Sequence, residues 1–448
     1  MKEEGARGTH VLVFPFPAQG HINPMLQFCK RLASKGLKVT LATTLFITKI
    51  AHNEVSNIRV EGISDGFDEG GMKEAESPYA YLERFQIVAP QSLAELIEKQ
   101  ESSGYPFRCL IYDSMMPWAL EIAKRFGLVT ASFFTQSCAN DAIYYNVKKG
   151  LLSIPVEGPT VSLPGLPILG IHDLPAFIYN WESYPPFLEL VLNQFQNVEK
   201  ADCLLINTFD KLEDEVLKWM SKLYPIKTIG PTMPLIYLDN RVEDDKDYGL
   251  SLFQPSKETY MDWLNMREAG SVIYVSFGSF AELGDEQMEE LALGLKSSNH
   301  YFLWVVRKSE ENKIPKSLVE AKSEKGLVVA WCSQLEVLAH NAVGCFMTHC
   351  GWNSTIEAVS LGVPMIAMPQ LADQTTNAKF VEDVWEVGVR VKLDEKGIAR
   401  REEIEQCVKE VMEGDRREQI KKNAFRWKVL AKEAVDEGGI QIRTLKNL

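Results

Sequence analysis

The sequence lacks the features that define several protein classes. Basic residues are outnumbered, with 48 Lys and Arg against 61 Asp and Glu, so the formal net charge is −13 at pH 7. A nucleic-acid binder needs a basic surface, and this class is excluded. No run of about 18 apolar residues occurs, so no segment is expected to span a membrane. The first residues, MKEEGARGTH, include acids, and Pro15 and Pro17 interrupt the apolar stretch that follows, so no secretory signal is predicted.

Cysteine and histidine are too scattered to form a metal-binding pattern. The eight cysteines contain no Cys-x-x-Cys pair, and a reduced protein of the cytoplasm is the simplest interpretation. Cys345, His349 and Cys350 are close in sequence, but a zinc site needs a fourth ligand at workable spacing. The Asp-Lys-Asp triplet at 245–247 lies in a charged stretch and not after an apolar strand, so we interpret it as a solvated loop. We therefore predict no bound metal.

What the chain does contain is an alternation of short apolar runs and longer amphipathic ones. Its 448 residues suggest two domains of about 200 residues each. Continuous apolar strands between helices predict an α/β protein with parallel sheets covered on both faces, and two such series predict two doubly wound domains. Strands are expected at 10–15, 37–44, 58–63, 108–113, 128–135, 202–208, 226–230, 271–277, 301–307, 327–331, 343–348 and 363–369. Helical patterns include 24–35, 116–126, 285–297, 374–385, 401–412 and 416–436.

A polar stretch marks the boundary between the two series. The polar stretch NRVEDDKDYGLS is predicted to be a linker, and it is flanked by Pro231, Pro234 and Pro255. We accordingly predict an N-terminal domain over 1–235, a linker over 236–257, a C-terminal domain over 258–425 and a final helix and tail over 426–448.

The most informative segment is residues 331–374, WCSQLEVLAHNAVGCFMTHCGWNSTIEAVSLGVPMIAMPQLADQ. In it an apolar strand runs into His349-Cys-Gly-Trp-Asn-Ser, where a helix is expected to begin. A strand, a tight turn containing Gly351 and a helix are how α/β proteins offer backbone N–H groups to phosphate. Asn353 or Ser354 is the predicted N-cap.

Acidic and amide side chains follow this turn at two places. Glu357 is expected in the first turn of the helix, where a carboxylate can accept from ribose hydroxyls. Asp373 and Gln374 are expected to end the next strand at the same sheet edge, with groups suited to sugar hydroxyls. The order along the chain therefore predicts sites for uracil, phosphate, ribose and sugar.

A histidine and an aspartate are expected at the corresponding edge of the first domain. Asn23 as N-cap and Pro24 at the first helical position would start a helix just after His21, which follows the first strand. Asp113 ends another apolar strand, so it should lie at the same edge, where open α/β sheets bind ligands. A carboxylate there can hold an imidazole in one tautomer. A packed or capping histidine and a helix N-cap at Asp113 remain as alternatives.

Residues 331–374 resemble the donor-binding signature of plant family 1 UDP-dependent glycosyltransferases, and the resemblance spans nearly the whole chain. It implies a GT-B fold, with two Rossmann-like domains facing each other across a cleft and a last helix that returns to the first domain. It implies His21 as the general base and Asp113 as its partner. The resemblance implies UDP-sugar contacts at Gly278, Ser279, Trp331, Cys332, Gln334, His349, Gly351, Trp352, Asn353, Ser354, Glu357, Asp373, Gln374 and Thr135. The ending GGIQIRTLKNL departs from the family pattern.

The resemblance also implies the reaction and the substrates. Trp352 and Gln374 match the pattern of relatives that use glucose, so UDP-glucose is the expected donor substrate, with no cofactor. The predicted activity is inverting transfer of glucose to a hydroxyl of a triterpenoid, steroid or phenolic acceptor by a monomer. The segment 163–190 contains no Lys or Arg, which favours a neutral acceptor. The expected acceptor-pocket residues are Phe16, Met115, Trp118, Phe134, Phe177 and Phe187. A transferase that makes glucose esters of carboxylic acids and a non-catalytic UDP-sugar-binding protein remain as alternatives.

Overall fold

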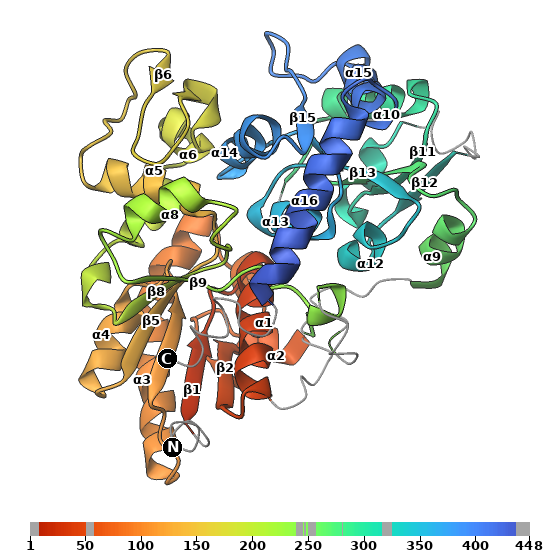
Figure 1. The fold of residues 1–448 in the computed structure, drawn as a ribbon. Coiled ribbons are helices and arrows are strands. Elements are labelled where there is room, and N and C mark those ends of the chain that lie inside the picture. Colours follow the sequence, from red (N-terminus) through yellow and green to blue (C-terminus); the bar gives the residue numbers. More distant parts are fainter. Residues whose placement is uncertain are drawn as a thin grey trace.

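Two parallel sheets form the framework of the molecule (Figure 1). The structure is a computed structural model, and it describes residues 9–50, 58–238, 245, 248–249, 257–279, 281–315 and 325–435. Within these residues a two-stranded antiparallel hairpin, β6 (Thr160–Val161) and β7 (Leu169–Gly170), accompanies the two large sheets.

The first sheet has seven strands in the order β3-β2-β1-β4-β5-β8-β9, and each neighbouring pair is parallel. Its strands are β1 (His10–Phe14), β2 (Lys38–Thr44), β3 (Ile58–Ile63), β4 (Cys109–Asp113), β5 (Val129–Phe134), β8 (Cys203–Ile206) and β9 (Ile226–Thr228). Its helices include α1 (Gln19–Ser34), α2 (Leu45–Ile50), α3 (Pro78–Ser102), α4 (Trp118–Arg125), α5 (Cys138–Lys148), α6 (Ala176–Tyr179), α7 (Pro185–Asn193) and α8 (Asp214–Met220).

The second sheet has six parallel strands in the order β12-β11-β10-β13-β14-β15. These are β10 (Val272–Ser276), β11 (Tyr301–Val305), β12 (Gly326–Val329), β13 (Val343–Thr348), β14 (Met365–Ala367) and β15 (Gly388–Arg390). Its helices include α9 (Lys257–Asn265), α10 (Asp285–Ser297), α12 (Gln334–Leu338), α13 (Trp352–Leu361), α14 (Gln374–Lys379), α15 (Arg401–Met412) and α16 (Arg417–Val435). The predicted organisation of two doubly wound parallel sheets is confirmed.

Alternate residues of each strand enter different cores. In β1, Leu12 and Phe14 join one buried apolar cluster, whereas Val11 and Val13 join the cluster on the opposite face. The second sheet is likewise covered by a separate apolar cluster on each face. Burial on both faces explains why these strands read as continuous apolar runs in the sequence.

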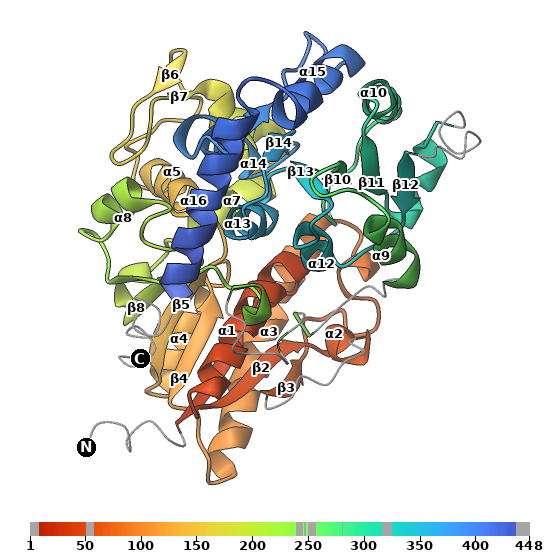
Figure 2. The ribbon, with the colours of Figure 1, turned by 45° about the vertical axis from the view of Figure 1, so that its right-hand side comes forward.

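The last helix ties the two halves together. Figures 1 and 2 show α16 running from the second sheet towards the first. Its buried Trp427 and Val435 belong to the same apolar cluster as Phe209 and Leu212, which follow β8. The cluster therefore contains side chains from both halves of the chain. The predicted domain limits remain predictions, and the tail at 438–448 lies outside the described residues.

Several predicted boundaries were wrong. α1 begins at Gln19, with Ala18 as its N-cap, so Pro24 lies inside the helix and Asn23 is not the cap. A proline has no N–H, so the carbonyl of Gly20 four residues earlier loses its usual helical partner. The side chain of Asn353 donates to that carbonyl at 2.7 Å instead. A contact from the other domain thus compensates for the internal proline.

The helix after β13 also starts earlier than predicted. Gly351 is its N-cap and Trp352 its first residue, so neither Asn353 nor Ser354 caps it and Glu357 lies in its second turn. The predicted helix at 374–385 is α14 followed by a π-helical turn at Phe380–Val384. The short strands β6, β7 and β15 were not predicted, because runs of two or three residues carry no periodic signal.

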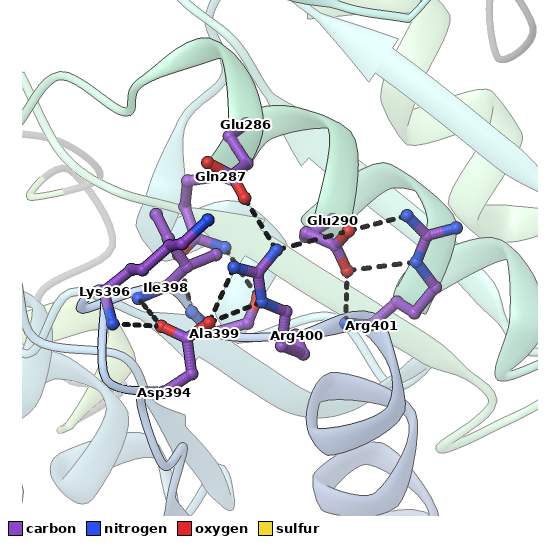
Figure 3. A network of polar contacts seen from close by, with 9 residues as sticks. All are labelled: Glu286, Gln287, Glu290, Asp394, Lys396, Ile398, Ala399, Arg400 and Arg401. Carbon is purple, nitrogen blue, oxygen red and sulfur yellow. Dashed lines mark hydrogen bonds and ion pairs between the residues drawn. The ribbon is translucent and has the colours of Figure 1, made fainter.

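An ion-pair network fastens α15 to α10 (Figure 3). The Glu290 carboxylate accepts from the Arg401 side chain at 2.6 and 3.0 Å and from the Arg401 backbone N–H at 2.7 Å. That N–H lies at the first position of α15 and has no partner within the helix. These hydrogen bonds lower the pKa of Glu290 below its ordinary value. Glu290 therefore caps α15 from another helix.

We predict that Glu290→Gln lowers the free energy of unfolding by about 1 kcal/mol at pH 7, measured by urea titration. Because the folded-state pKa of Glu290 lies below the unfolded value, its stabilisation is present above the unfolded pKa and disappears as the pH falls through the folded one. The difference between variant and wild type should therefore shrink in acid. The exposed neighbour Glu289 offers the control Glu289→Gln. An equal loss of stability in both variants would contradict the capping role.

Candidate active site

The structure brings His21 and Asp113 together at the carboxyl edge of the first sheet. Asp113 is the last residue of β4, which pairs with β1, and His21 lies in the first turn of α1. The Asp113 carboxylate Oδ2 lies 2.7 Å from Nδ1 of His21, and the Thr135 hydroxyl lies 3.1 Å from the same nitrogen. Nδ1 is therefore occupied, and Nε2 is the nitrogen left for a substrate. The His21 side chain keeps 21% of its surface exposed, whereas that of Asp113 is fully buried.

Main-chain groups fix the orientation of Asp113. Its Oδ1 accepts from the N–H of Met115 at 3.0 Å, and its Oδ2 accepts from the N–H of Phe16 at 3.3 Å. α4 begins at Trp118 with Pro117 as its cap, so Asp113 is not a helix N-cap. The carboxylate instead connects the turn after β4 to the turn after β1, with the imidazole between them.

The turn before α13 is built around His349. Gly278 has a φ of +72°, and a Cβ there would lie 2.8 Å from the His349 ring. A Cβ on Gly351 would lie 2.6 Å from Nε2 of the same ring. Both positions therefore require glycine for close approach. Burial lowers the pKa of His349 to about 4, so this imidazole is neutral at pH 7.

Glu357, the side chain predicted to contact ribose, belongs to a buried hydrogen-bonded group. Gln334 Nε2 donates to Ser354 Oγ at 2.9 Å and to Glu357 Oε2 at 2.7 Å. The Tyr248 hydroxyl donates to Glu357 Oε1 at 2.5 Å. Burial raises the pKa of Glu357 to about 7. Tyr248 was not predicted here, since a single tyrosine in a charged linker carries no signal of its position.

Asp373 and Gln374 lie at the start of α14, and five residues separate them from the end of β14. They therefore do not end the strand as predicted. Asn377 Nδ2 donates to Asp373 Oδ2 at 2.8 Å, and burial raises the pKa of Asp373 to about 6. The Gln374 Oε1 accepts from the backbone N–H groups of Gln370 and Leu371 at 2.8 Å each. The Gln374 oxygen thus holds the turn at 370–371.

Trp331, Cys332 and Ser279 were also predicted to contact the donor, and they differ in burial. Trp331 follows β12 and is half-buried, and the buried Cys332 places its sulfur 3.4 Å from the Tyr274 hydroxyl. Ser279 is exposed, and its carbonyl accepts from Arg307 at 2.7 Å.

Trp352 bridges the two halves of the chain. Its indole N–H donates to the carbonyl of Asn207 at 2.7 Å, and its backbone N–H bonds the Asp373 carboxylate. The indole N–H therefore binds the first domain. The backbone N–H of Trp352 helps to orient the Asp373 carboxylate.

The six predicted acceptor residues belong to the core of the first domain or pack against it. The Phe16 ring lies 5.3 Å from the His21 ring, and Phe85 connects Phe16 to Trp118 with centroid distances of 5.9 Å. Met115 and Trp118 line a cavity of about 370 Å³ between α3, α4 and α7.

Three of these residues pack elsewhere. The Phe177 and Phe187 rings stack on each other, with their centroids 5.6 Å apart. Phe134 is 1% exposed and contacts Phe195, which places it inside the core and not at a surface.

Neither a metal-binding cluster nor a membrane span occurs among the described residues. No group of three or more His, Cys, Asp or Glu there could hold a metal ion, and no helix there is long and apolar enough to cross a bilayer. The Asp245 carboxylate accepts from Lys30 at 2.9 Å and from the N–H of Leu235 at 2.8 Å. Asp247, the other acid of the triplet, lies outside the described residues.

Comparisons with known proteins agree with this arrangement. The family described as UDP-glucoronosyl and UDP-glucosyl transferase matches residues 240–434, and a glycosyltransferase N-terminal domain matches residues 8–69. Mogroside I-E synthase from Siraitia grosvenorii is 52% identical over 96% of this chain and 95% of its own. Flavonol 7-O-beta-glucosyltransferase UGT74F1 from Arabidopsis thaliana is 48% identical over 97% of this chain and 96% of its own.

Solved structures give the same result. Os79 from O. sativa in complex with UDP superposes with a TM-score of 0.93 at 42% identity over 98% of both chains. The two parallel-sheet domains of this chain have the GT-B arrangement that the family resemblance implied. The extent and level of these similarities show that the chain belongs to the plant UDP-dependent glycosyltransferase family.

Proposed function

We propose that this glycosyltransferase moves glucose from UDP-glucose to a hydroxyl of a lipophilic small molecule, with inversion at the anomeric carbon. The observation that carries the proposal is the 2.7 Å contact between His21 Nδ1 and the buried Asp113 carboxylate. A carboxylate at Nδ1 favours the tautomer with its proton on that nitrogen, so Nε2 is a base.

The chemical step follows from this geometry. The acceptor O–H gives its proton to Nε2 of His21 while its oxygen forms a bond to the anomeric carbon. The bond between that carbon and the diphosphate breaks on the opposite face, through an oxocarbenium-like state, and UDP leaves with the electron pair. The N-terminus of α13, with Asn353 and Ser354 in its first turn, favours the charge on the leaving diphosphate. No metal is needed in this scheme.

Glucose is the proposed sugar because of the polar groups at the start of α14. Asp373 is an acceptor above its pKa of about 6, and the NH₂ group of Gln374 is a donor. Such a pair discriminates between epimers, since a misplaced hydroxyl leaves a buried polar group without a partner. The names of several relatives support glucose, as for the flavonol 7-O-beta-glucosyltransferase.

A neutral acceptor is proposed from the charge of the first-domain cavity. Besides Met115 and Trp118, its lining contains Glu83, Glu121 and Glu189, and no Lys or Arg. These three acids are exposed, so the argument rests on the lack of a cation in the lining: burying a carboxylate acceptor there would cost free energy without an ion pair in return. Os79 has been solved with a trichothecene, which supports acceptance of polycyclic molecules in this fold. We further propose that the enzyme acts as a monomer in the cytoplasm.

Three predictions test the proposed function, and the first concerns the base. His21→Ala should lower kcat by at least about 100-fold, because the acceptor proton has no receiver. The measurement is initial-rate kinetics with UDP-glucose and a triterpenoid or phenolic alcohol, with UDP binding by calorimetry as the control for folding. Near-normal kcat in His21→Ala would remove His21 from the mechanism. Asp113→Ala should fall in the same direction but less far, and a larger loss there than at His21 would mean that the two roles are wrongly assigned.

The second prediction concerns the donor. Gln374→Ala should raise KM for UDP-glucose by about 5- to 10-fold, the equivalent of one hydrogen bond, while inhibition by UDP stays unchanged. Trp331→Ala should instead weaken UDP itself, because the expected stacking on uracil is lost. Steady-state kinetics with UDP as inhibitor separates the two. Turnover should persist in EDTA, and dependence on an added divalent ion would contradict the metal-free scheme.

The third prediction concerns the acceptor. A neutral sterol or triterpenoid alcohol should show a higher kcat/KM at pH 7 than a benzoic-acid-type substrate, because the cavity lining contains no Lys or Arg to pair with a carboxylate. Products should be identified by mass spectrometry and tested with mild alkali, which cleaves esters. If the acid is preferred by more than about tenfold, equivalent to 1.4 kcal/mol, the ester-forming alternative holds.

A further inference from the structure

A segment of the first domain is docked directly on the sugar end of the donor site. It comprises residues 171–176, from the short helix Ile171–Asp173 to the start of α6. Thr375 and Thr376 of α14 donate through their hydroxyls to the carbonyls of Leu174 at 2.6 Å and Asp173 at 2.7 Å. Figure 1 shows α6 and α14 facing each other in this region.

A partly buried ion pair closes the same contact. The Arg390 guanidinium lies 2.6 Å from Asp173 Oδ1 and donates to the carbonyl of His172 at 2.9 Å. Lys379 lies 3.5 Å from the other Asp173 oxygen, which also accepts from the N–H of Gly170 at 2.9 Å. The Asp173 and Arg390 side chains are only 15% and 20% exposed, so solvent screens this pair less than a surface pair.

The docked segment also holds a backbone turn in an unfavourable conformation. Ala372 has a φ of +55°, in the left-handed region that costs about 1 kcal/mol or more for a residue with a Cβ. Its carbonyl accepts from the N–H of Ala176 at 2.7 Å, and Asp373 and Gln374 follow immediately. Since Gln374 holds the other side of this turn through Gln370 and Leu371, the turn is fixed from both sides.

We infer that Asp173 is a positioning residue for the donor hexose, acting through Arg390 and the strained turn at 370–374. The same segment continues into α6, whose Phe177 ring stacks on the Phe187 ring of α7. The inference rests on the proposed function for the identity of the sugar. Asp173 lies in the first domain, whereas Asp373 and Gln374 lie in the second. The inference therefore gives a first-domain residue a role in sugar binding.

The test compares the binding of UDP-glucose and of UDP by calorimetry. Asp173→Asn and Arg390→Gln should each weaken UDP-glucose by about 3- to 10-fold, while the Kd for UDP changes by less than about twofold. The double variant should lose no more than either single variant, because the two residues act as one unit. The ratio of turnover with UDP-glucose to that with UDP-galactose should fall in the same variants.

Arg401→Gln is the matched control. Arg401 forms a paired guanidinium–carboxylate contact with Glu290 (Figure 3), and neither residue belongs to the proposed donor site, so its loss should lower stability and leave both dissociation constants unchanged. Thermal melts establish that each variant is folded. Equal weakening of UDP and UDP-glucose, or unchanged UDP-glucose binding in both folded single variants, would overturn the inference. Because binding is measured without an acceptor, a wild-type enzyme that binds UDP-glucose but transfers nothing would overturn the proposed function alone.

Discussion

The contact on which the site depends is the one between the Asp113 carboxylate and Nδ1 of His21, at 2.7 Å. It can form because β1 and β4 are parallel neighbours whose carboxyl ends meet at one edge. Asp113 is fully buried and receives main-chain N–H groups from the turns that follow both strands. The first domain thus holds the imidazole through Nδ1, which leaves Nε2 for a substrate.

The second domain contacts the first through hydrogen bonds from α13 and α14. Asn353 bonds the Gly20 carbonyl, Trp352 bonds the Asn207 carbonyl, and Thr375 and Thr376 bond the segment 171–176. Each of these side chains comes from the start of α13 or α14, where the donor is proposed to bind. The hydrogen bonds that join the domains therefore also hold the starts of α13 and α14 against the first domain.

The sequence predicted the long elements, because continuous apolar runs are strong signals, and the block at 331–374 supplied most of the residues proposed for the donor site. It did not predict where α1 and α13 begin. The start of α1 involves a long-range contact, in which Asn353 bonds the Gly20 carbonyl. The start of α13 involves the close approach of Gly351 to the His349 ring, which the sequence pattern does not reveal. Tyr248 and the pair of Asp173 and Arg390 were missed because their contacts join residues far apart in the sequence. β15, which carries Arg390, has three residues and no periodic pattern.

The tautomer of His21 tests the central claim most directly. With ¹⁵N-labelled histidine, nuclear magnetic resonance of the resting enzyme at pH 8 reports which ring nitrogen carries the proton. The account predicts that the His21 signal, assigned by its loss in His21→Ala, shows a proton on Nδ1 and a bare Nε2. It also predicts that the proton signal on Nδ1 moves in Asp113→Asn. A proton on Nε2 in the wild-type enzyme would contradict the account, because that nitrogen could not then accept the proton of the acceptor.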